Sequence, residues 1–353
     1  MIKLSRYILF LTTLAAAISC RPDSSVQDGP VPITFDASEN SMEISAKAGA
    51  ELQGASTFNN EGNTFAVYGT WTVPNGTSAN IFTKQTVTRG ATNWTYAPLR
   101  YWQKSGSYIF RGVYPITATT TSSSNGSSLV VNYSMSTEDY DLMVANSSKR
   151  DISTGNTDPV PMSFRHALAA VRFIFQKGSQ TTVDYHLMSF DLQYLLSVGT
   201  LVFNSIAQDA SLDSQWWVAD DFRPASLYPW SGDIQVPSAY ADWPGTGSPE
   251  WEEWHCVLPQ KLRNTSTEEK PSVRFSSSIK TGSDYSDPAF TIIELPETYT
   301  YIDGESVQHT VDAVWEAGKK YTYYIQIQPS GASIKVYATD WDSYKVAVED
   351  LMF

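Results

Sequence analysis

The chain has 353 residues, of which 42% are hydrophobic and 13% aromatic, and its formal net charge is −13. This length suffices for about two domains, and the apolar content excludes a wholly disordered chain. No basic stripe occurs in the sequence, which argues against nucleic acid and anionic lipid headgroups as partners.

The N-terminus has the pattern of a bacterial lipoprotein signal. A short basic start is followed by an apolar stretch over residues 7–14 and by small residues that lead to Cys20. The apolar stretch is too short to span a bilayer, so residues 1–19 are expected to be a cleaved signal peptide. Cys20 is the predicted site of lipid attachment; ordinary secretion remains open, because Ala17 stands where leucine is commonest. Residues 20–31 are rich in Pro, Ser, Asp and Gly and predict a flexible tether.

After the tether, short alternating apolar segments are separated by clusters of Gly, Asn, Ser and Thr. Segments of this kind, bounded by turn residues, are typical of strands in an all-β sandwich. The expected strands are 33–35, 64–68, 108–114, 128–133, 141–145, 192–196, 200–203, 254–258, 272–277, 289–295, 320–328 and 333–337.

Residues 164–175 carry two signals. Ala167 to Ala170 could begin a helix, whereas Val171 to Phe175 alternates and ends near Gly178. We interpret the stretch as a strand, with a helical turn before it as an open alternative.

A polar stretch over residues 147–156 is followed by Pro159 and Pro161. Prolines after a polar segment indicate a linker, so the domain boundary is placed there. We expect an N-terminal β-sandwich over residues 32–160 and a C-terminal β-sandwich over residues 161–353.

The segment 209–253 is long for a loop in a compact domain, so it either has a function or contains short strands. Exposed tryptophan rings stack on sugars, whereas buried rings pack between sheet and loop. Both interpretations remain open, and exposure of the rings distinguishes them. The tryptophans for which a ligand contact is considered are Trp216, Trp217, Trp251 and Trp254.

An ordered set of motifs runs along most of the chain. The motifs are Phe65 to Gly69, Trp94 to Trp102, Tyr108 to Pro115, Asp141 to Ala145, Phe164 to Phe173 and Trp315 to Ile325. With the lipoprotein signal, this set resembles the fimbrillin family of Bacteroidota, including its anchor-like and tip-like relatives.

The resemblance implies two tandem transthyretin-like β-sandwich domains and no enzymatic activity or cofactor. It implies a lipid-anchored, surface-exposed protein of the outer membrane that works in a fimbrium, in adhesion. In polymerising members of the family, a trypsin-like protease removes the N-terminal strand, and a C-terminal strand of the next subunit fills the groove. Such β-strand addition combines main-chain hydrogen bonds with the fit of alternating side chains.

Mapped onto this chain, the strand to be removed would be Pro32 to Ser45. Its inward anchors would be Ile33, Phe35, Met42 and Ile44. The partners implied are other fimbrial subunits, through strand exchange, and the outer membrane, through the lipid. A host or bacterial surface glycan or protein is a further partner, and a surface glycan-binding lipoprotein is the alternative function.

The cleavage site departs from the family pattern, which has an arginine after this strand. No arginine lies between Arg21 and Arg89, and Lys47, before Ala48, is the basic residue available. Either Lys47 is cut, or the strand stays and the subunit acts as an anchor or minor component.

The C-terminal segment, Asp342 to Phe353, leaves two interpretations open. Its alternating apolar residues are Tyr344, Val346, Val348, Leu351 and Phe353, with one break in the pattern. The segment is either a donor strand for another subunit or the last strand of the second sandwich.

The sequence lacks the usual catalytic and metal motifs. The four histidines are scattered, and His255 and Cys256 are neighbours in a strand, so they point to opposite faces. Cys256 is expected to be a buried free cysteine, because Cys20 is assigned to the lipid. The pairs Glu252–Glu253 and Asp220–Asp221 are expected to be surface carboxylates rather than a glycosidase pair. Asp340 and Asp342 lack a full calcium loop.

Overall fold

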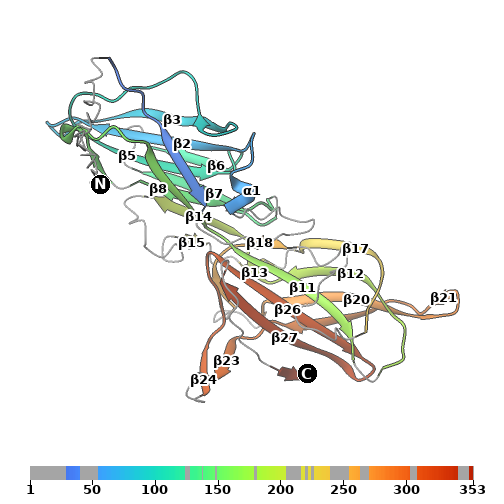
Figure 1. The fold of residues 1–353 in the computed structure, drawn as a ribbon. Coiled ribbons are helices and arrows are strands. Elements are labelled where there is room, and N and C mark those ends of the chain that lie inside the picture. The colour runs from blue at the N-terminus through green and yellow to red at the C-terminus, as the bar shows by residue number, and fades with distance from the viewer. Residues whose placement is uncertain are drawn as a thin grey trace, which may run out of the picture.

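The computed structural model describes residues 29–39, 55–123, 128–136, 138–147, 149–178, 181–203, 216–218, 222–223, 226–238, 254–262, 270–302, 308–340 and 350–352. These residues form two lobes of β-strands (Figure 1). The helical elements among them are α1 (Ala55–Phe58) and the 3-10 turn η1 (Ile152–Thr154). The all-β class predicted from the sequence is confirmed.

The first lobe is built on one large sheet, here called the main sheet, whose strands follow the order β1-β10-β8-β5-β2-β3-β4, with β9 beside β5. All of its pairings are antiparallel except that of β1 with β10. The strands are β1 (Phe35–Glu39), β2 (Thr64–Thr72), β3 (Ser78–Arg89), β4 (Trp94–Thr95), β5 (Ser107–Tyr114), β8 (Met143–Asn146), β9 (Arg150–Asp151) and β10 (Val160–His166).

The middle of the main sheet is buried on both faces. Along β2, Phe65 and Val67 belong to one hydrophobic core, and Ala66 and Tyr68 belong to another. Side chains alternate between the two faces of a strand, so β2 contributes to a core on each side. A continuous apolar run, rather than an alternating one, is the pattern expected of such a strand.

A second sheet joins strands from distant parts of the chain, in the order β15-β14-β7-β6. The strands are β6 (Thr119–Ser122), β7 (Leu129–Ser134), β14 (Val198–Phe203) and β15 (Trp216–Val218). β14 pairs with β7 over six residues. Strand β14, which lies after residue 160 in the chain, is therefore paired with β7, which lies before it. The division into two domains at residues 160 and 161 stays a prediction.

The second lobe is a sandwich of two larger sheets. One has the order β18-β11-β26-β27-β28 and the other β17-β12-β20-β21, with β22 beside β20. Their strands are β11 (Ala169–Lys177), β12 (Tyr185–Gln193), β17 (Leu227–Gln235), β18 (His255–Val257), β20 (Ser272–Thr281), β21 (Asp284–Tyr285), β22 (Ala289–Glu294), β26 (Lys319–Gln328), β27 (Gly331–Asp340) and β28 (Asp350–Met352). Rings from both sheets meet between them, as in the T-shaped contact of Phe175 with Phe275.

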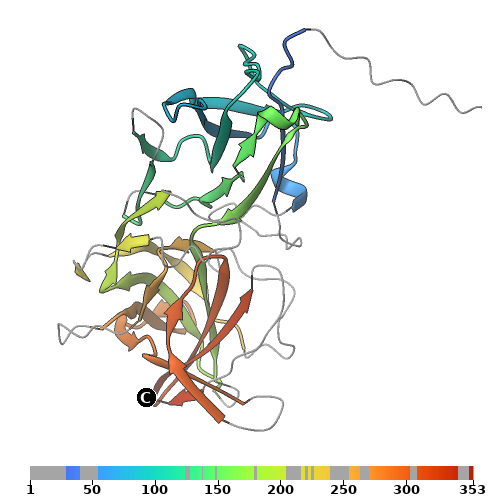
Figure 2. The ribbon, with the colours of Figure 1, turned by 90° about the vertical axis from the view of Figure 1, so that its left-hand side faces the viewer.

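Three two-stranded sheets complete the described fold: β13 with β16, β19 with β25, and β23 with β24. Their strands are β13 (Leu195–Leu196), β16 (Phe222–Arg223), β19 (Gln260–Lys261), β25 (Val314–Trp315), β23 (Thr298–Ile302) and β24 (Gln308–Asp312). The pair β23–β24 projects from the second lobe as a ribbon (Figures 1 and 2).

The structure resolves two alternatives left open by the sequence. Residues 164–175 contain the end of β10 and most of β11, and the two residues between these strands, Ala167 and Leu168, are buried in a non-helical turn. The long segment 209–253 contains the short strands β15 and β16 and the nine-residue strand β17.

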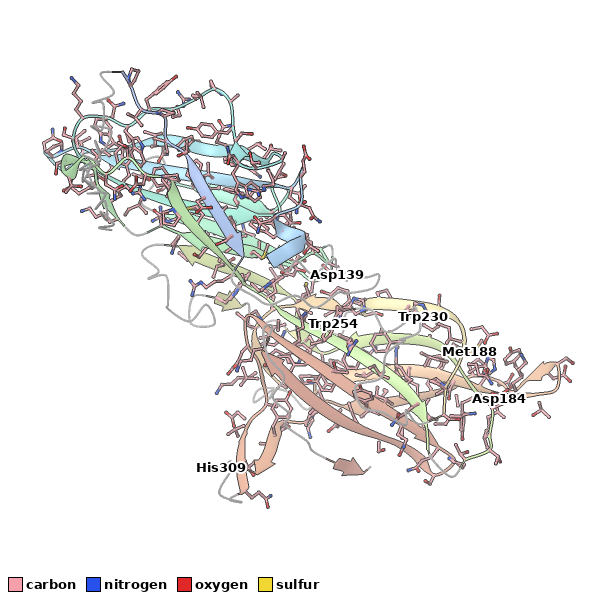
Figure 3. All side chains as sticks on the ribbon, viewed as in Figure 1. Asp139, Asp184, Met188, Trp230, Trp254 and His309 are labelled. Carbon is pink, nitrogen blue, oxygen red and sulfur yellow. The ribbon has the colours of Figure 1, made fainter. Side chains whose placement is uncertain are left out.

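Polar side chains connect the two lobes at their junction, where Figure 3 labels Asp139 and Trp254. One carboxylate oxygen of Asp139 lies 2.9 Å from His255 Nδ1, and the other accepts a hydrogen bond of 3.0 Å from the backbone N–H of Cys256. Tyr133 and Tyr228 donate from their hydroxyls to the Cys256 carbonyl, at 3.2 and 2.6 Å. The apolar core is also continuous from β7 to the second lobe, so we expect the lobes to move as one body.

Candidate functional site

The N-terminal strand is the part of the fold that the sequence connects most directly with function. β1 pairs in parallel with β10, with Phe35 opposite Val160. On its other side, Ile33 N–H donates to the Arg100 carbonyl at 2.8 Å, and Trp102 N–H donates to the Val31 carbonyl at 3.0 Å. The segment 31–39 is therefore bonded to β10 on one side and, just ahead of β1, to residues 100–102 on the other.

The side chains of this segment alternate between core and solvent. Ile33, Phe35 and Ala37 are buried, with Phe35 5% exposed, whereas Thr34 and Asp36 are exposed. This is the period-two pattern of a strand whose inner face fills an apolar space. Burial of one such isoleucine or phenylalanine side chain contributes about 1.5–3 kcal/mol.

An aromatic socket receives Phe35. Its ring centroid lies 5.5–6.5 Å from those of four rings, in T-shaped or tilted contacts. Edge-to-face pairs of this kind are each stabilising beyond their buried area. The four rings are Phe65, Phe82, Tyr96 and Phe110.

Tyr96 of the socket and the nearby Trp94 hold the main chain of the inserted strand. Tyr96 donates from its hydroxyl to the Ile33 carbonyl at 2.8 Å, and Trp94 donates from Nε1 to the Ala37 carbonyl at 2.9 Å. A carbonyl is present in any residue, so these contacts select an extended backbone rather than a side chain. Trp94 to Trp102 is one of the motifs that carry the family resemblance, but the sequence does not show that its rings meet the N-terminal strand.

The remaining residues predicted for lipidation, for cleavage and as anchors of the N-terminal strand lie outside the described part of the chain. These are Cys20, Met42, Ile44, Lys47 and Ala48. Their roles stay predictions.

The C-terminal segment is described at Asp350–Met352, which forms β28. It pairs antiparallel with β27, with Leu351 opposite Ile334. This pairing agrees with a last strand of the second sandwich, and a donor role stays a prediction.

The tryptophans considered for sugar binding are buried where their side chains are described. Trp216 is 9% exposed, and its Nε1 donates to the Ala167 carbonyl at 2.7 Å. Trp254 is 8% exposed, with the Arg172 guanidinium 4.6 Å and the Lys320 ammonium 5.5 Å from its ring centre. Burial of both rings argues against a sugar platform at these residues.

The other two tryptophans give no test of the sugar-binding interpretation. Trp251 and the side chain of Trp217 lie outside the described residues. A sugar contact at either one stays a prediction.

Three histidines each face an aspartate that is distant in sequence. Their Nδ1 atoms lie 2.8, 2.5 and 2.9 Å from a carboxylate oxygen. The sequence indicates which segments form strands but not which strands lie side by side, so these histidine–aspartate pairs were not predicted. The pairs are His166 with Asp141, His186 with Asp233, and His255 with Asp139.

Cys256 is a buried free cysteine, as the sequence predicted. Burial raises the pKa of its thiol well above the usual value, which disfavours the reactive thiolate. Glu252, Glu253 and the pair Asp220–Asp221 lie outside the described residues.

Among the described residues, no three His, Cys, Asp or Glu side chains are arranged to hold a metal ion. In that same part of the chain, no helix is long and apolar enough to cross a membrane.

Asp233 makes a testable contribution to stability at neutral pH, and this contribution is lost in acid. Hydrogen bonds from His186 and from Tyr285, whose hydroxyl is 2.8 Å away, hold the Asp233 pKa below its usual value. This contribution is fully present above the unfolded-state pKa of about 4 and is lost as the pH falls through the folded-state pKa. D233N should therefore be less stable than the wild type at neutral pH, and the difference should disappear in acid.

Urea unfolding over a pH series measures this difference. D287N, at an exposed carboxylate in the same region, is the matched control. A D233N deficit that persists unchanged in strong acid would contradict the assignment.

The geometry defines an all-β protein whose first lobe holds its own N-terminal strand in an aromatic socket. The model of the family described as fimbrillin-like matches residues 53–341, so the chain belongs to the fimbrillin-like family. No curated protein sequence matches the chain significantly.

Among solved structures, a fimbrial protein from Bacteroides vulgatus is similar in fold, with a TM-score of 0.54 and 13% identity, over 88% of this chain and 99% of that one. The tip fimbrial protein Mfa3 from Porphyromonas gingivalis, truncated at its C-terminus, aligns with a TM-score of 0.38 and 11% identity, over 83% and 97%. A fimbrial assembly protein from Parabacteroides distasonis aligns with a TM-score of 0.41 and 8% identity, over 91% and 100%.

Proposed function

We propose that this protein is a structural or anchor subunit of a fimbrium that assembles by β-strand exchange in the first lobe and has a role in adhesion. The carrying observation is the way in which the segment 31–39 is held. It makes main-chain hydrogen bonds on both sides, Phe35 lies in the aromatic socket, and Ile33 is buried in the same core. A strand of another subunit with apolar residues at alternate positions would meet the same contacts.

The proposal includes the N-terminal processing that the sequence predicts. Cys20 carries the lipid that attaches the subunit to the outer membrane, and the subunit faces the cell surface. Cutting between Lys47 and Ala48 frees the preceding strand and opens the socket. If the strand stays, the socket remains closed and the subunit acts as an anchor.

Limited proteolysis tests this mechanism. We expect a trypsin-like protease to cut the purified mature protein after Lys47, and ladder-like oligomers to follow, as seen by N-terminal sequencing and electron microscopy. K47A should prevent both events, whereas K104A, at an exposed lysine of the first lobe, should prevent neither. An excess of a synthetic peptide covering residues 32–45 should suppress the ladders, because it occupies the socket.

Two outcomes would contradict polymerisation through this socket. One is an N-terminal strand that stays intact, which favours an anchor. The other is cleavage that leaves only monomers, which favours a capping subunit.

A further inference from the structure

Among the described strands, β22 forms an edge of the second lobe. Along its length β22 pairs with β20, and no other described strand pairs with it. Ile293 points into the core and is buried, which fixes the strand to the lobe. Figure 1 shows β20 and β21 extending to the end of the second lobe that lies away from the first.

The register shows which backbone groups of β22 are free. Leu295 N–H donates to the Pro271 carbonyl at 2.8 Å, so this pair is hydrogen-bonded. In an antiparallel ladder every second residue is hydrogen-bonded to the same neighbour, so Ile293, Thr291 and Ala289 face β20. The N–H and C=O groups of the alternate residues point away from the sheet, and these residues are Phe290, Ile292 and Glu294.

Two of those residues also expose large apolar side chains. Phe290 is 70% and Ile292 is 60% exposed, and their neighbours across the ladder are the polar residues Ser276 and Arg274. A strand that presents both free backbone groups and exposed apolar side chains is a template for the addition of another strand.

Acidic residues border this edge at both ends. Asp284 and Asp287 are exposed before β22. At its other end, Glu294, the last residue of β22, and Glu297 share one lysine, Lys270, at 3.0 and 3.5 Å. With a net charge of −13 on the whole chain, the edge complements a basic partner rather than an acidic one.

We propose that β22 is a docking edge for an extended segment of another protein, which adds to the sheet as a further strand. The segment has apolar residues at alternate positions, to cover Phe290 and Ile292, and lysine or arginine at both ends. A second copy of this chain fits less well, because antiparallel pairing of two β22 strands about Thr291 brings their acidic ends together. The edge lies in a different lobe from the socket of β1, so its occupancy is independent of strand exchange there.

Peptide binding to the full mature chain tests the proposal. The probe is a fluorescein-labelled peptide, Lys-Lys-Val-Thr-Val-Thr-Val-Lys-Lys, titrated by fluorescence anisotropy. F290S should weaken binding by about ten- to a hundredfold, the amount that corresponds to burial of one phenylalanine side chain. The same peptide with glutamate in place of its lysines should bind more weakly.

I292P is the sharper variant, because the N–H at residue 292 does not bond to β20. Proline there removes an outward donor and leaves the existing ladder in place. We expect it to abolish binding without a change in urea unfolding. L99S, which alters an exposed apolar residue of the first lobe, is the matched control and should bind like the wild type.

Equal binding by I292P and the wild type would overturn the proposal, as would equal binding of the basic and acidic peptides. Dimerisation of the protein that I292P abolishes would overturn the choice of partner in favour of a second copy. Binding should be the same before and after cleavage at Lys47, so failure here is distinguishable from failure of strand exchange.

Discussion

F35A is expected to destabilise the first lobe by about 3–5 kcal/mol, the usual cost of replacing a buried phenylalanine with alanine. The reason is that Phe35 fills a socket of four rings, and alanine would leave that socket largely empty. Urea unfolding, compared with the wild type, measures the loss.

The matched control is D36A on the same strand, because Asp36 points to solvent. This variant should change stability by less than about 0.5 kcal/mol. Equal effects of F35A and D36A would show that the socket does not hold the strand, and strand exchange would then lose its structural basis.

F35A also bears on assembly. A strand that is held less tightly leaves the socket more readily, so the variant should accept the synthetic peptide of residues 32–45 faster than the wild type. Trp94 and Tyr96 bind main-chain carbonyls and should serve the replacement strand as they serve β1. F35A and the wild type therefore differ in the contribution of one side chain to holding the strand, whereas the backbone hydrogen bonds are the same in both.

Strands with strong apolar signals were predictable from the sequence. The segments 108–114 and 128–133 correspond closely to β5 and β7. Their periodicity reports burial directly, because each strand has at least one face in a core.

β3 was not predicted, although it has 12 residues. Its sequence is mostly polar, and only Phe82 and Val87 are buried. The strand is held by its pairing with β2, a tertiary contact that local propensity does not encode.

The socket around β1 could be predicted only in part. The family resemblance implied Ile33 and Phe35 as inward anchors, and both are buried. The ring partners are separated from them by tens of residues, and no alternating pattern says which parts of the chain will meet. For the same reason, the aspartate partners of the histidines became visible only in the fold.

W216A is expected to destabilise the protein by about 3–5 kcal/mol, and this result separates a structural tryptophan from a sugar-binding one. Trp216 lies in the sheet shared by the two parts of the chain and hydrogen-bonds to the Ala167 carbonyl. It packs closely at Gly199, where an added Cβ atom would stand 3.2 Å from Trp216 Cε3 and 2.7 Å from Leu258 Cδ2. Loss of the indole should therefore lower the stability of both lobes, because it weakens the packing at their junction.

Unfolding followed by a probe in each lobe measures this coupling. If the two lobes share a core, their unfolding transitions should coincide and should shift together in W216A. The control is V198A, at an exposed residue of the adjacent strand, which should leave both transitions nearly unchanged. If Trp216 instead formed a sugar platform, W216A would abolish glycan binding and keep the stability of the wild type. Because the indole is buried and its N–H is already bonded, we expect the loss of stability.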